Sequence, residues 1–352
     1  MKTRVCRLHG QGDIRIEEID VAAPGPGQVL IAMGAGGICG SDLHYFKDGG
    51  FGPIRVQEPI ILGHEVAGTI RGFGSGVEGL AEGDRVAINP SRPCNACIYC
   101  RQGLQQHCLT MRFFGSALRF PHEQGGFRDL MVVDAAQCVR LENPEVSLAE
   151  AACAEPLAVC LHAFERAGTS AGNLAGKRVL VTGAGPIGAL TVAALRHAGA
   201  EQIVVTDLED YPLDIARRMG ATETINIRTQ PDLLAGYAAG KGHFDVAFEC
   251  SAAAPAIRAA IQATRPQGTV VAVGVAGEVA VPLNLIVGKE IAFIGTHRFT
   301  AEYAAAVRMI DRRAIDVRAI ISATHDIGSA PVAFDMAQDR CRAIKVQLSF
   351  AS

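Results

Sequence analysis

Residues 177–188 read KRVLVTGAGPIG, and this run is the strongest structural signal in the chain. Its apolar start predicts a buried strand over Lys177–Thr182, which passes directly into a glycine-rich turn and then into an apolar helix. In a G-x-G-x-x-G turn the first glycine permits the tight bend, the second lets the backbone approach a pyrophosphate, and the third allows close helix packing. The helix N-terminus attracts the anion. The predicted cofactor-binding residues of the turn are Gly183, Gly185, Pro186, Ile187 and Gly188.

An acidic residue follows this turn at the spacing that a dinucleotide site requires. A second strand, predicted over Gln202–Thr206, ends at Asp207, about twenty residues beyond the glycines, where a carboxylate would meet the adenosine ribose hydroxyls. Asp207 is followed by Glu209 and Asp210, and these charges would repel a 2′-phosphate. NAD is therefore the expected cofactor, with NADP possible. The alternative is a glycine-rich turn in some other α/β protein.

The surrounding pattern predicts an α/β protein with two domains. Alanine-rich helical stretches alternate with Val/Ile runs after Pro144, which is typical of a doubly wound parallel sheet. The opening third, to about Gly126, is rich in Gly and Pro with short β-branched runs, which favours a β-rich domain. The tail from Glu290 is expected to return to that first domain. We expect a catalytic domain of residues 1–152 and 287–352, and a dinucleotide-binding domain of residues 153–286. The other expected strands and helices are Phe244–Glu249, Thr269–Val273, Ile187–His197 and Leu213–Met219.

Bulk composition narrows the class of protein. The chain has 352 residues, 49% of them hydrophobic, enough for two cores. The formal net charge is -3, with acids and bases mixed, so no one-sided basic surface is expected for nucleic acid. The first twenty residues lack a signal-peptide pattern, and the apolar window Gly268–Gly288 is interrupted by polar residues, which favours sheet core over a membrane span. The expected location is the cytoplasm.

Four of the eleven cysteines crowd into one short loop. Their spacing is C-x2-C-x2-C-x7-C, and four thiolates so close together can surround a zinc ion with no position left for substrate. This predicts a structural zinc site, and clustered thiols without an export signal indicate a reducing compartment. The alternative is a loop of reduced cysteines without metal. The predicted ligands are Cys94, Cys97, Cys100 and Cys108.

A catalytic zinc site needs three protein ligands and an open position. Candidate ligands occur in three separate segments, and each segment is ambiguous alone because an isolated Cys, His or Glu usually has a structural or surface role. Their joint presence beside a dinucleotide turn and a four-cysteine loop favours catalysis. The segments are GICGSDLH at residues 37–44, LGHE at 62–65 and AEPL at 154–157.

These motifs together resemble the zinc-containing medium-chain dehydrogenase family over essentially the whole chain. The residues at 37–42, 63–65 and 155–157 resemble the corresponding motifs of the sorbitol dehydrogenase branch. The runs MRFFGSA at 111–117 and RFPH at 119–122, together with GGF from residue 125, further resemble L-idonate 5-dehydrogenases. The resemblance implies a GroES-like catalytic domain beside a Rossmann domain, and a homotetramer.

The resemblance also implies roles for individual residues. Cys39 and His64 would hold the catalytic zinc, with Glu65 as the third ligand and Glu155 bound directly or through a water. Asp42 would orient His64. Ser41 would hydrogen-bond the substrate hydroxyl, and His44 would pass its proton towards solvent.

The expected substrate is a small molecule with a secondary hydroxyl. A sugar acid carries a carboxylate that favours a guanidinium, and Arg112 and Arg298 lie in segments that the family places near the cleft. The specific expectation is oxidation of L-idonate to 5-keto-D-gluconate with NAD(P). A neutral polyol dehydrogenase for sorbitol or xylitol is the alternative. A noncatalytic structural or binding member of the fold is a third possibility, which the intact set of candidate ligands disfavours.

Overall fold

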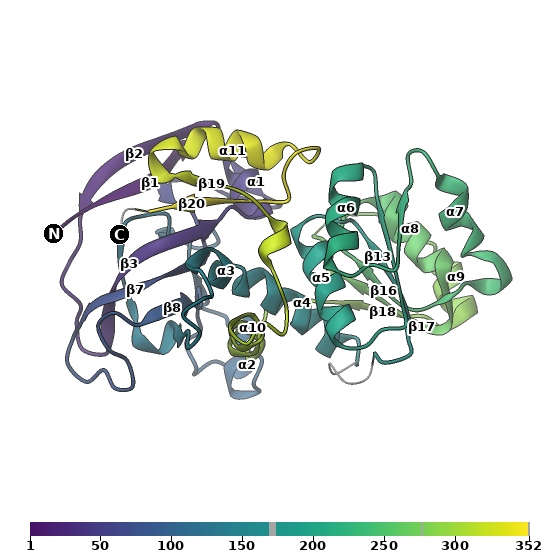
Figure 1. Ribbon diagram of the computed structural model, residues 1–352, viewed down its shortest axis with the longest axis horizontal. Coiled ribbons are helices and arrows are strands. Elements are labelled where there is room, and N and C mark those ends of the chain that lie inside the picture. The colour runs from purple at the N-terminus through teal and green to yellow at the C-terminus, as the bar shows by residue number, and fades with distance from the viewer. Residues whose placement is uncertain (169–173, 276, 351–352) are drawn as a thin grey trace.

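The computed structural model describes residues 1–168, 174–275 and 277–350. Its strands form two groups that lie side by side, one made largely of antiparallel sheets and the other of a parallel sheet (Figure 1). Both termini lie in the antiparallel group. The predicted fold class, a β-rich GroES-like part beside a Rossmann part, is confirmed.

The parallel sheet has six strands within the described residues, in the order β15, β14, β13, β16, β17, β18. The chain runs outward from β13 in both directions, so the strand order reverses there, which is where doubly wound sheets bind ligands. The four strands predicted from the sequence are confirmed, and β15 and β18 were not predicted. The bounds are β13 Arg178–Thr182, β14 Gln202–Asp207, β15 Glu223–Asn226, β16 Phe244–Glu249, β17 Thr264–Ala272 and β18 Ala292–Gly295.

Alternate side chains of β13 pack against helices on opposite faces of this sheet. Val179 and Val181 belong to the core cluster that includes α5 and α6, whereas Leu180 belongs to the cluster that includes α8. This alternation follows from the two-residue period of a strand and requires an apolar run, because both faces are buried. The helices of this part are α5 Pro186–His197, α6 Asp210–Met219, α7 Pro231–Gly236, α8 Ala254–Ala263 and α9 Leu283–Lys289.

Two expectations about the end of this part need correction. The strand β18 pairs with β17, so the tail from Glu290 first adds one more strand to the parallel sheet before it returns to the antiparallel part. The window Gly268–Gly288 is sheet core only in its first half, because α9 in its second half has no buried residue. Apolar composition alone cannot distinguish a buried strand from an exposed apolar helix.

The antiparallel part is built around a seven-stranded sheet of the described residues, in the order β12, β8, β7, β3, β20, β19, with β11 also paired to β3. As predicted, the end of the chain returns here, because β20 lies between β3 and β19. The long strands are β1 Lys2–Gly10, β2 Asp13–Asp20, β3 Gln28–Gly37, β7 Glu65–Phe73, β8 Arg85–Ile88, β11 Leu130–Asp134, β12 Cys138–Arg140, β19 Ile321–Asp326 and β20 Lys345–Ser349. The short strands are β4 Gly50–Phe51, β5 Ile54–Arg55, β6 Ile60–Ile61, β9 Ser91–Arg92 and β10 Arg112–Phe113.

Three helices join the two parts. One core cluster extends from α3 and α4 through α10 to β13 and α5, so the interface is continuous with the cores on either side. His162 on α4 bonds Glu302 on α10 at 2.8 Å. Burial alone would raise the pKa of Glu302, but hydrogen bonds from His162 and from the backbone lower it to about 2. The joining helices are α3 Leu148–Ala152, α4 Ala154–Arg166 and α10 Glu302–Asp311. The antiparallel part also carries α1 Gly40–Asp48, α2 Ile98–Arg101 and α11 Ala330–Gln338.

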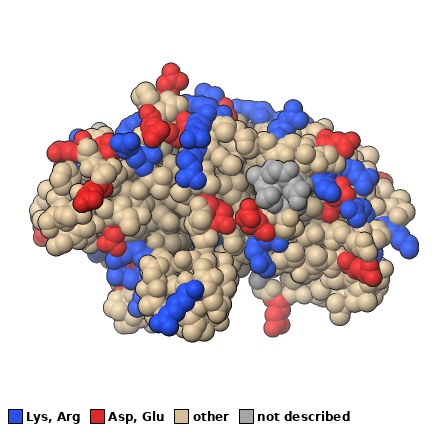
Figure 2. Space-filling view, turned by 90° about the horizontal axis from the view of Figure 1, so that it is seen from below, with Lys and Arg blue, Asp and Glu red and all other residues tan. Residues whose placement is uncertain are grey.

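The molecular surface carries charges of both signs. Acidic and basic side chains are interspersed over the face in Figure 2. Among the described residues, no helix combines the length and apolar character that crossing a membrane requires.

Candidate active site

The glycine-rich turn forms a cradle at the end of β13. Gly183 has a φ of +87°, a conformation that L side chains rarely adopt. A Cβ on Gly188 would lie 1.8 Å from the carbonyl oxygen of Gly183, so only glycine allows α5 to start this close to the strand. The helix begins at Pro186 after Gly185, which leaves the N–H groups of its first turn available to an anion. Ile187 packs against the core behind them.

The predicted acid lies beside this turn. Asp207 ends β14 and is buried, and its Oδ2 accepts a hydrogen bond of 2.7 Å from the backbone N–H of Ala184. The structure therefore brings the predicted turn and the predicted acid together. Arg340, from the turn that follows α11, also donates to Oδ2 at 2.7 Å, a contact that the sequence pattern did not indicate.

Three of the predicted metal ligands form a compact cluster. One ligand atom each from Cys39, His64 and Glu65 lies within 4.8 Å of the others. Strand pairing produces this cluster, because Gly37 at the end of β3 is paired with Glu65 at the start of β7. A Cβ on Gly37 would lie 2.1 Å from Oε2 of Glu65, so the glycine makes room for the carboxylate.

The cluster has the chemistry of a zinc site. It offers a thiol, an imidazole and a carboxylate, which are the ligand types of zinc centres. Oε2 of Glu65 is buried, and its polar neighbour among the described residues is Nζ of Lys345 at 2.7 Å. A carboxylate oxygen has two lone pairs, so one remains available to an ion. Burial, with the neighbouring charge of Glu65, raises the pKa of the Cys39 thiol to about 11 in the absence of metal. A cation at this position would favour the thiolate.

Asp42 braces the loops that carry these ligands. Its carboxylate is fully buried and accepts hydrogen bonds from the backbone N–H groups of Cys39 at 3.0 Å and Gly63 at 3.3 Å. Its Oδ1 lies 3.8 Å from Nδ1 of His64, which is an ion-pair distance and too long for a hydrogen bond. Asp42, which was predicted to orient His64, therefore acts mainly by holding the backbone at Cys39 and at Gly63, the residue before His64.

A buried lysine completes the surroundings of Glu65. Lys345, at the start of β20, places Nζ 2.8 Å from Oε1 and 2.7 Å from Oε2 of Glu65, and it also donates to the carbonyl of Ile38 at 3.0 Å. Both side chains are almost fully buried. Burial lowers the pKa of Lys345, but the charges of Glu65 and Cys39 outweigh it and raise the pKa above its usual value. Sequence reasoning missed this residue, because a lysine in a strand near the end of the chain carries no motif.

Glu155 lies near the cluster without joining it. Its carboxylate is not part of the three-residue group. It lies in the first turn of α4 and is buried. Burial, opposed by the charge of His64 and reinforced by those of Glu65 and Cys39, raises its pKa to about 8. The geometry therefore favours Glu65 over Glu155 as the carboxylate that shares an ion with Cys39 and His64.

The two predicted proton-handling residues lie on α1. Ser41 is half-buried in the first turn of the helix, directly after the Cys39 segment. His44 lies one turn further on and is exposed, and its Nδ1 lies 2.9 Å from Oδ2 of Asp48. The helix thus leads from the cluster towards solvent.

The four-cysteine loop folds into a second compact cluster. The four sulfur atoms lie within 4.8 Å of one another, as the spacing predicts. The backbone N–H of Cys97 donates to the sulfur of Cys94 at 3.3 Å. Hydrogen bonds, first from the backbone of Ala96 and then from Thr110 and Cys97, lower the pKa of Cys94 to about 6. A thiolate is thus available at neutral pH, as zinc binding requires.

The aromatic ring of Phe113 links Arg298 to the first cluster. Its guanidinium carbon lies 4.3 Å from the ring centre of Phe113, and the same ring lies 5.3 Å from the ring of His64. Burial lowers the pKa of Arg298, against the charge of Glu155. Its φ of +53° is uncommon for a residue other than glycine and indicates a site where local strain is tolerated.

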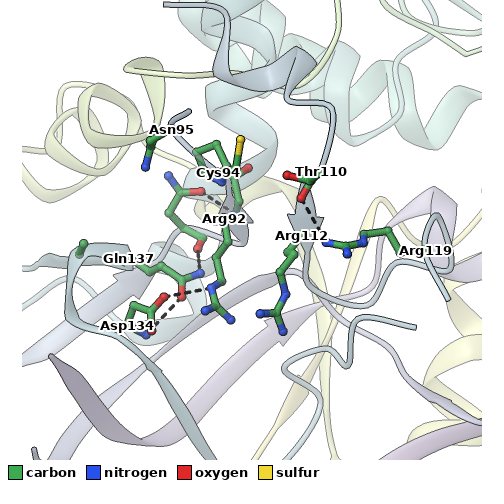
Figure 3. A pocket seen from close by; sticks show the side chains of 12 residues that line it. Arg92, Cys94, Asn95, Thr110, Arg112, Arg119, Asp134 and Gln137 are labelled. Carbon is green, nitrogen blue, oxygen red and sulfur yellow. Dashed lines mark hydrogen bonds and ion pairs between the residues drawn. The ribbon is translucent and has the colours of Figure 1, made fainter. Parts of the chain in front are cut away.

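Arg112 points elsewhere. It precedes Phe113 in β10 and so lies on the opposite face of the strand. There it forms two hydrogen bonds with Glu123, at 2.7 and 3.0 Å, and lines a polar cavity of about 560 Å³ beside the four-cysteine loop (Figure 3). Neither the Cys39 segment nor His64 lines this cavity. The structure does not bring Arg112 together with the metal cluster.

His122, in the RFPH run at residues 119–122, has a structural position. Its Nε2 accepts a hydrogen bond of 2.8 Å from the backbone N–H of Gln57, and its Nδ1 lies 2.6 Å from the carbonyl of Arg119. Both ring nitrogens are therefore occupied in holding two loops together, which leaves none for substrate.

Known proteins match this chain along its length. Residues 25–143 match the alcohol dehydrogenase GroES-like domain, and residues 186–312 match the zinc-binding dehydrogenase family. The L-idonate 5-dehydrogenase (NAD(P)+) of Escherichia coli K12 is 39% identical over 99% of this chain and 99% of its own length. The chain belongs to the zinc-containing medium-chain dehydrogenases. Human sorbitol dehydrogenase, 36% identical over 93% of this chain and 90% of its own length, places the dehydrogenase in the sorbitol branch.

Solved structures agree with this dehydrogenase assignment. The crystal structure of Escherichia coli L-idonate 5-dehydrogenase superposes with a TM-score of 0.94 and covers 99% of each chain. A zinc-binding dehydrogenase from Sinorhizobium meliloti, solved with bound NADP, superposes with a TM-score of 0.89 at 27% identity and also covers 99% of each chain.

The buried ion pair between Lys345 and Glu65 should contribute to the stability of this dehydrogenase. With metal removed by a chelator, Lys345→Met should lower the free energy of unfolding by about 3–5 kcal/mol, because Glu65 would keep a buried charge without a partner. Urea unfolding of the chelator-treated protein measures this. Adding zinc should narrow the difference, since the ion supplies positive charge to the same carboxylate. Lys47→Met, at an exposed position on α1, is the control, and equal stability of the Lys345 variant and the wild type would contradict the prediction.

Proposed function

We propose that this chain oxidises a secondary hydroxyl of a sugar acid, with L-idonate to 5-keto-D-gluconate as the specific reaction and a nicotinamide dinucleotide as hydride acceptor. The observation that carries this proposal is Arg298, a cation on the ring of Phe113, which in turn lies beside His64. No acidic side chain neutralises Arg298 by a direct contact within the described residues. A guanidinium so placed suits a substrate carboxylate. The L-idonate 5-dehydrogenase of Escherichia coli supports the same substrate.

Each residue of the first cluster then has a task. Cys39, His64 and Glu65 would hold zinc, which when bound supplies Lewis acidity that lowers the pKa of a neighbouring hydroxyl. Ser41 would accept a hydrogen bond from the substrate hydroxyl at Oγ and, as it takes that proton, pass its own proton on, and His44, exposed beside Asp48, would carry a proton to solvent. Lys345 holds the Glu65 carboxylate in place. Glu155, whose raised pKa allows it to be neutral near pH 7, would add a negative charge to the site only when it loses its proton.

The cofactor is proposed to be NAD, with NADP also accepted. The cradle at Gly183, Gly185 and Gly188 suits the pyrophosphate, and Asp207 suits the adenosine ribose. The NADP in the Sinorhizobium meliloti structure and the name of the Escherichia coli relative support use of either cofactor.

A neutral polyol is the second candidate substrate, because human sorbitol dehydrogenase is 36% identical. The same metal cluster would serve both reactions, so only the surroundings of the substrate distinguish them. Arg298 has no obvious partner on a neutral polyol, which is why we favour the sugar acid.

The substrate proposal is tested by comparing cofactor reduction with L-idonate, sorbitol and xylitol. L-Idonate should be the best substrate, and Arg298→Met should raise its KM by about tenfold or more, the loss expected for a charge-assisted hydrogen bond. Arg112→Met should change KM by less than about threefold, because Glu123 already holds that guanidinium. Activity with sorbitol or xylitol but none with L-idonate would refute the sugar-acid assignment.

Two zinc sites are proposed for each chain, one catalytic and one structural. Metal analysis of Cys39→Ser should show loss of one zinc ion and of turnover, with the fold retained. Cys94→Ser should lose the other ion and lower the melting temperature, because the loop that carries the four thiols would lose its cross-link. Unchanged turnover in Cys39→Ser would contradict the assignment of the catalytic site.

The domain limits and the location are proposed as well. The sequence predicts a catalytic unit of residues 1–152 and 287–352 and a dinucleotide unit of residues 153–286. We propose to move residues 287–295 to the dinucleotide unit, because β18 pairs with β17, which leaves 1–152 and 296–352 for the catalytic unit. A cytoplasmic location is proposed because zinc thiolates require reduced cysteines.

A homotetramer is proposed, and two apolar patches support it. The first patch comprises exposed apolar residues of the edge strand β18, of α9 and of the loop that follows β17. The second comprises those of the four-cysteine loop and the loop that follows it. A tetramer with two kinds of two-fold contact needs two such surfaces. The exposed fractions in the first patch are 66% for Val275, 64% for Leu283, 69% for Val287 and 40% for Phe293; in the second they are 59% for Ile98, 65% for Leu109, 50% for Leu118 and 65% for Phe120.

Sedimentation tests the assembly. The wild type should sediment as a tetramer, and Phe293→Lys should yield smaller species, because it places a charge on the exposed edge of the sheet. Phe73→Lys is the matched control, since Phe73 is also an exposed phenylalanine but lies outside both patches. A monomeric wild type would refute the proposal.

A further inference from the structure

We propose that Arg340 determines cofactor preference, by offsetting the charge of Asp207 so that the adenosine ribose site accepts a 2′-phosphate as well as a 2′-hydroxyl. This inference rests on the proposed use of a nicotinamide dinucleotide. It concerns a residue outside the glycine motif, 133 positions along the chain from the acid that it contacts.

The hydrogen bonds of Asp207 show why Arg340 matters. Oδ1 accepts from the backbone N–H groups of Leu208 at 2.7 Å and Glu209 at 3.2 Å. Oδ2 accepts from the backbone N–H of Ala184 and from Nη2 of Arg340, each at 2.7 Å. A carboxylate has about four lone-pair positions, so all are taken. A ribose hydroxyl can bind Asp207 only at the position that Arg340 occupies.

Arg340 lies on the side from which a cofactor would arrive. Its side chain is 53% exposed, whereas that of Asp207 is 5% exposed. A Cβ on Gly185 would lie 3.9 Å from Nη2 of Arg340, so the guanidinium also borders the phosphate-binding turn. A group that approaches the end of β14 therefore meets the guanidinium before the carboxylate.

A second arginine neutralises the next acid. Nη2 of Arg228 lies 2.5 Å from Oε1 of Glu209, and Asp210 accepts a hydrogen bond from Asn226 at 2.6 Å. The sequence run of acids at 207, 209 and 210 predicts repulsion of a 2′-phosphate. In the folded chain Asp207 is paired with Arg340 and Glu209 with Arg228. These pairs weaken the repulsion that would otherwise exclude the 2′-phosphate of NADP.

The two cofactors would use this corner differently. The 2′-hydroxyl of NAD would donate to Oδ2 of Asp207 and displace Arg340 into solvent. The 2′-phosphate of NADP would instead accept hydrogen bonds from the displaced Arg340, a strong charge-assisted pairing. Arg340 is thus a specificity-determining residue that competes with one cofactor and attracts the other.

Equilibrium binding of NADH and NADPH to the zinc-loaded, full-length protein tests this, with cofactor fluorescence as the readout. Arg340→Met should weaken NADPH binding by about tenfold or more. NADH binding should change by less than about threefold or become tighter, because its competitor is gone. Arg342→Met is the matched control, since Arg342 lies in the same turn, is 72% exposed and pairs only with Asp339 among the described residues; its binding of both cofactors should match the wild type.

Each other outcome is decisive. An equal loss of both cofactors in Arg340→Met would show a merely structural role, and no loss of either would show no role; both overturn the proposal. Binding of NADH alone by the wild type would also overturn it, together with the proposed use of NADP, while leaving the proposed oxidation with NAD intact. Binding of neither reduced cofactor by the wild type would refute the proposed function itself.

Discussion

The register of three neighbouring strands is the constraint on which the metal cluster depends. β3 lies between β7 and β20, and their pairing sets Gly37 opposite both Glu65 and Gln347. Cys39 follows β3, His64 precedes β7 and Lys345 begins β20, so one register brings a thiol, an imidazole, a carboxylate and an ammonium group together. A slip by one residue would turn these side chains to the opposite face. The ligands are therefore fixed by backbone hydrogen bonds before any ion binds.

The second constraint is the close approach of α5 to β13. Glycines at 183 and 188 allow it, and the Ala184 N–H ties the resulting turn to Asp207 on the next strand. The two constraints lie in different parts of the molecule, and the shared core of α3, α4 and α10 holds those parts together. Glu155, at the start of α4, lies where the two meet.

Local sequence signals predicted a large share of this architecture. The apolar runs and glycine spacing located β13, β14, β16 and α5 to within a residue or two, and short-range cysteine spacing predicted the second metal cluster. β15 and β18 were not predicted because one is a short polar strand and the other an exposed edge strand. Neither shows the buried apolar run that is typical of a parallel strand. The sequence offered Arg112 and Arg298 as equivalent candidates. The structure distinguishes them, because Arg298 packs on Phe113 and Arg112 lies on the other face of β10.

Contacts over long sequence separations could not be predicted in this way. Lys345 and Arg340 each bind an acid far away in the chain, and neither belongs to a motif. An isolated lysine or arginine usually lies in solvent, so nothing in its immediate neighbours marks the exception. The same applies to Phe113, whose ring touches both His64 and Arg298 because of how β10 packs.

The pairing of Glu65 with Lys345 has a consequence for biosynthesis. The two residues are separated by 280 positions, which at typical translation speeds is on the order of tens of seconds of ribosome time. Throughout that interval the nascent chain holds a carboxylate whose counter-charge has not yet been made, and β3 lacks one of its neighbours. The N-terminal part of the chain therefore cannot complete its fold until β20 has been synthesised. Zinc bound early by Cys39, His64 and Glu65 would supply the positive charge that Lys345 provides later.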